Sequence, residues 1–171
     1  MDTGSSCKTA HSNSIPEPGH IRRARADERL GLLALWECSV RATHTFLAEA
    51  DIDFYRPLTA EILRGNALDL WVITDNADRP LGFLGMVGQA VEALFLEPSY
   101  RRQGAGRRLI DHAQCLSGGA LTVEVNEQNL DALRFYQALG FQIVSRSACD
   151  PMGRPFPLLH LRRLPPEALQ R

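Results

Sequence analysis

A run of apolar residues stops at a proline and leads into a turn that places two glycines among four arginines. The stretch reads LFLEPSYRRQGAGRRLIDHA and spans Leu94 to Ala113. Its first part is typical of a strand, and the apolar spacing after the turn is typical of an amphipathic helix. A helix start exposes unpartnered backbone N–H groups and a partial positive charge. Because Gly104 and Gly106 carry no Cβ, an anion can approach this backbone closely, so the stretch predicts a phosphate site.

Three phosphate-binding patterns compete for this turn. The P-loop requires Lys-Ser or Lys-Thr after its last glycine, and no such pair follows here. The dinucleotide fingerprint requires a third glycine where this chain has Leu109, and the unit does not open a βαβ repeat. The third pattern, [RQ]xxGx[GA], belongs to acetyl-CoA pyrophosphate loops. It is matched in full by Arg101, Arg102, Gln103, Gly104, Ala105 and Gly106. An ordinary solvated turn with surface arginines is the alternative that this hexapeptide leaves open.

Charge and cysteine usage narrow the class of protein. The formal net charge of −1 gives no global electrostatic case for binding nucleic acid or an anionic membrane. No apolar run approaches the length of a membrane span, and no apolar signal core stands near the start. Four cysteines form no CxxC pair and no cluster with histidine, which indicates reduced thiols and no metal site. We therefore expect a cytoplasmic protein without metal, membrane or nucleic-acid partners.

The chain of 171 residues predicts one domain, 20–164, between a disordered N-terminal tail, 1–19, and a C-terminal tail, 165–171. The predicted order is β-α-α-β-β-β-α-β-α-β-β, a mixed α/β or α+β domain. The elements are expected at His20–Ala26, Glu28–Thr43 with Asp27 as N-cap, 54–65, Leu68–Thr74, Leu81–Val87, Ala90–Leu96, the helix from the glycine turn to Gly118, Leu121–Val125, the helix from its cap Asn129 to Leu139, Phe141–Ser147 and Pro157–Leu164.

A second motif makes the fold prediction specific. The segment NEQNLDALRFYQALGF, Asn126–Phe141, is similar to the NxxAxxFYxxxGF segment of the GNAT superfamily, the Gcn5-related N-acetyltransferases. With the glycine turn and the element order, the chain resembles this family over roughly His20 to Arg163, and it looks closest to small bacterial members. The resemblance implies an α+β fold with a mostly antiparallel twisted sheet of roughly six or seven strands, about four helices, and central strands that splay apart.

The resemblance also implies acetyl-CoA as cosubstrate. Backbone amides of 102–107 would bind its pyrophosphate, and the strand before the turn would pair with its pantetheine arm. The implied cofactor-binding residues are Leu94, Phe95, Leu96, Arg101, Arg102, Gln103, Gly104, Ala105, Gly106, Arg107, Asn129 and Tyr136.

The chemistry of acetyl transfer needs a proton acceptor for the amine and a proton donor for the leaving thiolate. Tyr136 occupies the place of the family's general-acid tyrosine, and Glu124, twelve residues earlier, matches the base of some members that acetylate protein N-termini. Glu92 is a rival base acting through water, and ordered water alone is another. His44 and Phe46 lie in the loop that shapes the acceptor site in this fold, so they are candidate substrate-binding residues together with Glu92.

The predicted activity is N-acetyl transfer from acetyl-CoA to a primary amine by direct attack in a ternary complex. The acceptor is left open between a small amine, an amino-acid derivative, a protein N-terminus and a lysine. A CoA-binding sensor without turnover is the main alternative, and a dinucleotide-dependent enzyme is a weaker one. Family members often pair through their sheets, so a homodimer is an open expectation.

Overall fold

The structure, a computed structural model, describes residues 19–165. Both predicted tails lie outside this range except for Gly19 and Pro165, and the backbone N–H of Gly19 donates to the Thr74 carbonyl. Within the described residues, no helix is both long enough and apolar enough to cross a membrane.

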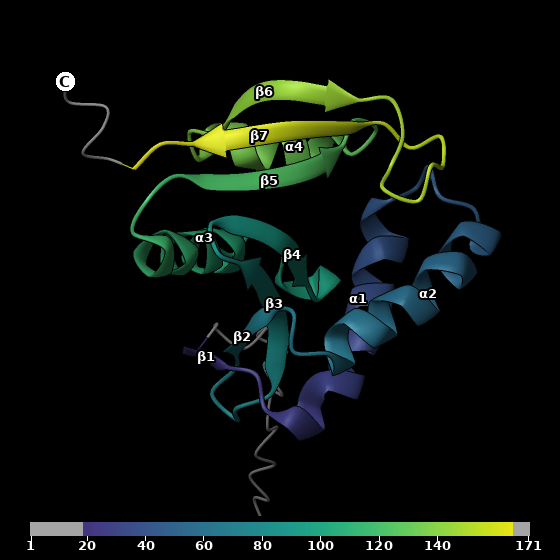
Figure 1. Ribbon diagram of the computed structural model, residues 1–171. Helices are drawn as coiled ribbons and strands as arrows, with labels where there is room; N and C mark the ends of the chain where they lie inside the picture. Colours follow the sequence, from purple (N-terminus) through teal and green to yellow (C-terminus); the bar gives the residue numbers. More distant parts are fainter. Residues whose placement is uncertain (1–18, 166–171) are drawn as a thin grey trace, which may run out of the picture.

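The strands form one seven-stranded sheet in the order β1-β2-β3-β4-β5-β7-β6. Every neighbouring pair is antiparallel except β4 and β5, which run parallel (Figure 1). This confirms the predicted α+β class with a mostly antiparallel sheet. The elements are β1 Ile21–Arg23, η1 Ala26–Glu28, α1 Arg29–Thr43, α2 Glu49–Arg64, β2 Asp69–Thr74, β3 Pro80–Val87, β4 Ala90–Leu96, η2 Pro98–Tyr100, α3 Ala105–Ser117, β5 Leu121–Asn126, α4 Leu130–Ala138, β6 Gln142–Ser147 and β7 Leu158–Arg163.

The two central strands separate soon after they meet. β4 and β5 pair only at Ala90 with Thr122 and at Val91 with Val123. From there to its end, β4 keeps its pairing with β3 but has no partner on the β5 side. The predicted splay is therefore confirmed, and it leaves a gap in the sheet at the end of β4 that leads into the glycine turn.

Each face of the sheet has its own apolar core. On one face, Leu109 and Ile110 of α3 are fully buried in a cluster with Leu84 of β3 and Val123 of β5. On the other face, α1 and α2 pack side by side and cover β2 and β3, with buried side chains such as Leu32, Trp36, Val72 and Phe83 (Figure 1). Because alternate side chains of a strand point to opposite faces, both cores draw on the same strands.

Two predicted helix starts are wrong. Asp27 does not cap α1, because it lies within a short 3₁₀ turn and the helix begins two residues later, at Arg29. The second helix begins at Glu49 rather than at 54, so Pro57 lies in its interior. The residue before this helix is Ala48, whose side chain cannot cap. The carboxylate of Asp51 instead accepts a hydrogen bond from the Ala48 N–H at 2.8 Å, a contact that the usual cap residues do not reveal.

We expect Gly82→Ala to destabilise the protein by about 1–3 kcal/mol, since overpacking forces neighbouring groups to shift. A Cβ at this position, where β3 pairs with the end of β4, would lie 2.8 Å from the Phe95 carbonyl oxygen and would overlap a Leu96 methyl. Gly31→Ala is the matched control. It lies in α1 with open space around a new Cβ, and it should stabilise by roughly 0.5–1 kcal/mol. Urea unfolding measures both, and a Gly82→Ala protein as stable as the wild type would contradict the packing argument.

Candidate functional site

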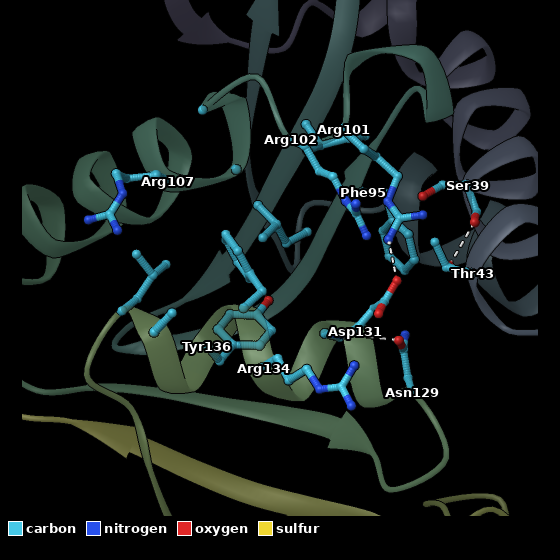
Figure 2. A pocket seen from close by; sticks show the side chains of 18 of the residues that line it. Ser39, Thr43, Phe95, Arg101, Arg102, Arg107, Asn129, Asp131, Arg134 and Tyr136 are labelled. Atoms are coloured by element: carbon cyan, nitrogen blue, oxygen red, sulfur yellow. Dashed lines mark hydrogen bonds and ion pairs between the residues drawn. The ribbon is translucent and has the colours of Figure 1, made fainter.

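A cavity of about 540 Å³ opens where β4 and β5 splay apart (Figure 2). Its walls come from the end of α1, the end of β4, the glycine turn with the start of α3, and one side of α4. The lining residues are Ser39, Thr43, His44, Leu94, Phe95, Leu96, Arg101, Arg102, Gly104, Gly106, Arg107, Asn129, Asp131, Ala132, Arg134, Phe135, Tyr136, Ala138 and Leu139. The predicted phosphate turn, the strand before it and the predicted acid Tyr136 therefore border one space.

The two glycines of the turn serve different purposes. Gly104 is the residue before α3 and has a φ of 82°, a left-handed conformation that glycine adopts without steric cost. Gly106 lies in the first turn of α3, and a Cβ there would lie 3.0 Å from the ring of Phe135 on α4. The first glycine thus lets the chain turn into the helix, and the second lets α3 and α4 approach each other. The helix start between them borders the cavity and has the partial positive charge expected there.

Arginines make the cavity electropositive. Arg101, Arg102 and Arg107 line it, as the motif predicts. Arg134 of α4 lines it as well, and sequence reasoning missed this residue. It lies two residues before Tyr136 in α4, where the sequence motif marks only the aromatic pair Phe135 and Tyr136. Among residues 19–165, Asp131 is the one carboxylate in the lining, and its Oδ2 accepts from Arg101 Nη2 at 3.2 Å (Figure 2).

Two residues of the predicted turn do not reach the cavity. The Gln103 side chain donates to the Ser99 carbonyl at 2.8 Å and so closes the turn. Ala105 is fully buried in the core under α3. Either can contribute through its backbone N–H alone, because neither side chain lines the space.

Tyr136 lies on α4 with its ring between two other aromatic side chains. Phe135 and Phe141 pack edge-on against it, with ring centroids 5.0 and 5.3 Å away. Burial raises the pKa of the phenol well above its ordinary value, so the group carries its proton at neutral pH. Figure 2 shows the hydroxyl directed into the cavity. No group of residues 19–165 makes a hydrogen bond with it, so the proton is available to a substrate.

Asn129 performs the capping role that its position predicts. Its Oδ1 accepts from the Ala132 N–H at 3.1 Å at the start of α4, and the residue is buried. It also borders the cavity. One side chain therefore holds the helix that carries Tyr136 and lines the space that Tyr136 faces.

The end of α1 forms the uncharged wall of the cavity. The Thr43 hydroxyl lies 2.8 Å from the Ser39 carbonyl and 2.8 Å from His44 Nδ1. Burial lowers the pKa of His44 to about 4, so its imidazole is neutral at physiological pH. The ring of Phe46 packs 5.5 Å from the imidazole without lining the cavity itself. Of the two predicted loop residues, His44 therefore lines the cavity. Phe46 packs against the His44 imidazole and does not line the cavity.

Neither predicted base lines the cavity. Val123 and Val125 face the α3 side, so Glu124 between them faces the opposite way, with 51% of its side chain exposed. Its Oε1 lies 3.1 Å from His160 Nδ1, and His160 Nε2 lies 2.7 Å from the Ser147 hydroxyl. Glu92 is exposed at a bulge of β4, where the register with β3 shifts. The role of Glu124 as base stays a prediction.

A cluster beside the α1 end ties α2 to the segment between β6 and β7. The Tyr55 hydroxyl donates to Asp150, and Arg154 donates to Asp51. The Arg154 guanidinium also lies 4.4 Å from the centroid of the Phe54 ring. Phe156 of the same segment packs between Tyr55 and Phe46. These partners are about a hundred residues apart in the chain, and no local pattern marks them.

Known proteins are similar to this chain in sequence. The model of the acetyltransferase (GNAT) domain matches residues 66–143. The peptidyl-lysine N-acetyltransferase YjaB of Salmonella typhimurium is 42% identical over 83% of this chain and 96% of its own length. YiaC of Escherichia coli, a peptidyl-lysine N-acetyltransferase, is 34% identical over 79% and 91%.

Solved structures agree with these matches. The solution structure of apo YjaB from Escherichia coli has a TM-score of 0.73 at 41% identity, covering 84% of this chain and 95% of its own. The PaiA N-acetyltransferase from Thermoplasma acidophilum, solved with coenzyme A, has a TM-score of 0.68 at 18% identity, covering 85% and 98%, and shares the fold. The chain therefore belongs to the GNAT family, and it is an acyl-CoA-dependent N-acyltransferase.

Proposed function

We propose that this N-acetyltransferase moves the acetyl group of acetyl-CoA to the side-chain amine of lysine residues in proteins, by direct attack within a ternary complex. The observation that carries the proposal is the gap between β4 and β5. It joins the start of α3, the free side of β4 and the Tyr136 hydroxyl in one cavity. The lysine acceptor is supported by the relatives at 42% and 34% identity, which are named as peptidyl-lysine N-acetyltransferases.

The residues present fit acetyl-CoA along the length of the cavity. The N–H groups at the start of α3, with Arg101, Arg102 and Arg107 around them, suit a pyrophosphate. The backbone of Leu94 to Leu96 has no strand partner on the β5 side, so its polar groups can pair with the amides of an extended pantetheine arm. A thioester held this way would place its sulfur toward the α4 wall that carries Tyr136.

The reaction then needs no covalent intermediate on the enzyme. A neutral amine attacks the thioester carbonyl carbon, the C–N bond forms, the C–S bond breaks, and the amine loses one proton. The phenol of Tyr136, kept protonated by burial, gives its proton to the departing sulfur. Within the described part of the chain, four arginines and one carboxylate line the cavity, and this charge balance favours a neutral amine over an ammonium cation.

We expect Gly104→Glu to lower the affinity for coenzyme A by at least about tenfold, which corresponds to about 1.4 kcal/mol. The new carboxylate would repel the pyrophosphate at the start of α3. Gly88→Glu is the matched control, because Gly88 also has a positive φ, has open space around a new Cβ, and does not line the cavity. Isothermal titration calorimetry compares the two, and equal affinities would place the pyrophosphate elsewhere.

We expect Tyr136→Phe to lower kcat by about 10²–10⁴-fold with little change in coenzyme A affinity, because a general acid contributes about this much. The aromatic packing with Phe135 and Phe141 is kept, so the fold should not change. Tyr100→Phe removes the same atom from a buried tyrosine outside the cavity lining and should retain full activity. Thiol release from acetyl-CoA reports both rates, and a wild-type kcat for Tyr136→Phe would remove the acid from the mechanism.

We expect lysine peptides to be acetylated on the side-chain amine, with a higher kcat/KM than spermidine, free amino acids or peptides with a free N-terminus and no lysine. The assay combines acetyl-CoA with each acceptor, and mass spectrometry locates the added acetyl group. Preference for a small amine would replace the proposed acceptor. Binding of acetyl-CoA without turnover on any acceptor would favour a sensor.

A further inference from the structure

The hydrogen bonds around Thr43 determine the tautomer of His44. A threonine hydroxyl has one proton to donate, and the Ser39 carbonyl at 2.8 Å can only accept it. The contact of the same oxygen with His44 Nδ1, also 2.8 Å, must then be donated by the imidazole. Nδ1 therefore carries the proton, and Nε2 keeps its lone pair.

Nothing in the described part of the chain uses that lone pair. No group of residues 19–165 makes a hydrogen bond with His44 Nε2, although the imidazole lines the cavity. Phe46 packs against the ring from behind, and Phe156 packs against Phe46 in turn. The imidazole is thus held in one orientation, with one nitrogen engaged and the other free to accept a proton.

The surroundings of His44 favour its neutral form. The ionisable groups that face the cavity are Arg101, Arg102, Arg107, Arg134, Asp131 and Tyr136. Four of these are cations, the one carboxylate pairs with Arg101, and Tyr136 stays uncharged. Burial holds the pKa of the imidazole below its usual range, so Nε2 is unprotonated before the reaction.

The carboxylates that the sequence predicts as bases are less well placed. Glu124 and Glu92 do not line the cavity, and Glu124 pairs with His160. Asp131 lines it but is held by Arg101. Among the described lining residues, His44 is the neutral side chain with a vacant acceptor nitrogen.

We propose that His44 Nε2 accepts the proton which the acceptor amine loses as it attacks the thioester. As the C–N bond forms, the N–H proton moves to Nε2, and as the C–S bond breaks, the Tyr136 proton moves to sulfur. Proton exchange with solvent then returns His44 to its neutral state and Tyr136 to its phenol. A weakly basic imidazole can accept this proton, because an amine nitrogen becomes far more acidic once it is bonded to the carbonyl carbon. This inference rests on the proposed function, since it concerns the same cavity and the same amine.

The central test compares His44→Ala with His44→Gln on a lysine peptide that the wild-type enzyme acetylates. We expect His44→Ala to lower kcat by about 10²-fold or more, the usual contribution of general base catalysis, with coenzyme A affinity unchanged. A glutamine amide can accept a hydrogen bond from the amine but cannot take its proton. His44→Gln should therefore show the wild-type KM for the peptide, while its kcat stays low. Recovery of kcat by glutamine would reduce His44 to a positioning residue, and wild-type kcat in both variants would overturn the proposal.

A second pair of variants tests the tautomer. Thr43→Val keeps the shape of the side chain but removes the acceptor for Nδ1–H, so the two tautomers should mix and kcat should fall several-fold. Thr43→Ser keeps the hydroxyl and should restore the rate. Nitrogen-15 NMR of the wild-type imidazole at neutral pH should show a neutral ring protonated at Nδ1. A ring protonated at Nε2, or a cationic ring, would overturn the proposal without any measurement of activity.

The same series of variants tests Glu124, the rival base, by its effect on kcat. Glu124→Gln should keep kcat within about twofold of the wild type, and a loss as large as that of His44→Ala would assign the proton to Glu124 instead. If lysine is not the acceptor, the wild-type enzyme itself will not acetylate the peptide. This outcome is distinct from any effect of the His44 variants. The most reactive small amine of the panel then serves as the reference for the His44 variants, and the NMR result stands in either case.

Discussion

The loss of pairing between β4 and β5 is the feature on which the rest of the site depends. Two parallel strands that stayed paired would use the backbone groups of Leu94 to Leu96 within the sheet, and no cavity would open beside them. The strands can separate because each is held by its other neighbour, β4 by β3 and β5 by β7, along its full length. Each half of the sheet also has helices packed on it, so the gap does not weaken either half.

The separation also explains why one cavity collects chemically different walls. The start of α3 and the arginines supply positive charge at one end, suited to a diphosphate. Tyr136 supplies a protonated phenol within an aromatic setting, because burial disfavours the phenolate. The end of α1 supplies an uncharged wall in which Thr43 orients the imidazole of His44. The proposed donor site, the proposed acid and the proposed base are thus carried by separate helices, α3, α4 and α1, whose ends border the same cavity.

The wall of the cavity at the end of α1 is supported by contacts that lie outside the cavity. The bond between Arg154 and Asp51, the bond between Tyr55 and Asp150, and the packing of Phe156 hold the segment before β7 against α2. Because Phe156 also contacts Phe46, which packs on His44, this bracing reaches the imidazole through direct ring contacts. The packing of the segment before β7 and the orientation of His44 are therefore physically linked.

Local patterns in the sequence determined the strands, the α3 start and its glycines, the Asn129 cap and the place of Tyr136. Each of these depends on neighbours within a few residues, through periodicity, backbone conformation or capping. The start of α2, the orientation of Glu124 away from the cavity, and the arrival of Arg134 and His44 in its walls were decided by the tertiary structure. These depend on how distant segments pack, on which face of β5 is buried, and on hydrogen bonds such as that between Thr43 and His44. A sequence shows which groups are capable of acid–base chemistry, but burial and the geometry of contacts determine which of them can reach the reacting atoms.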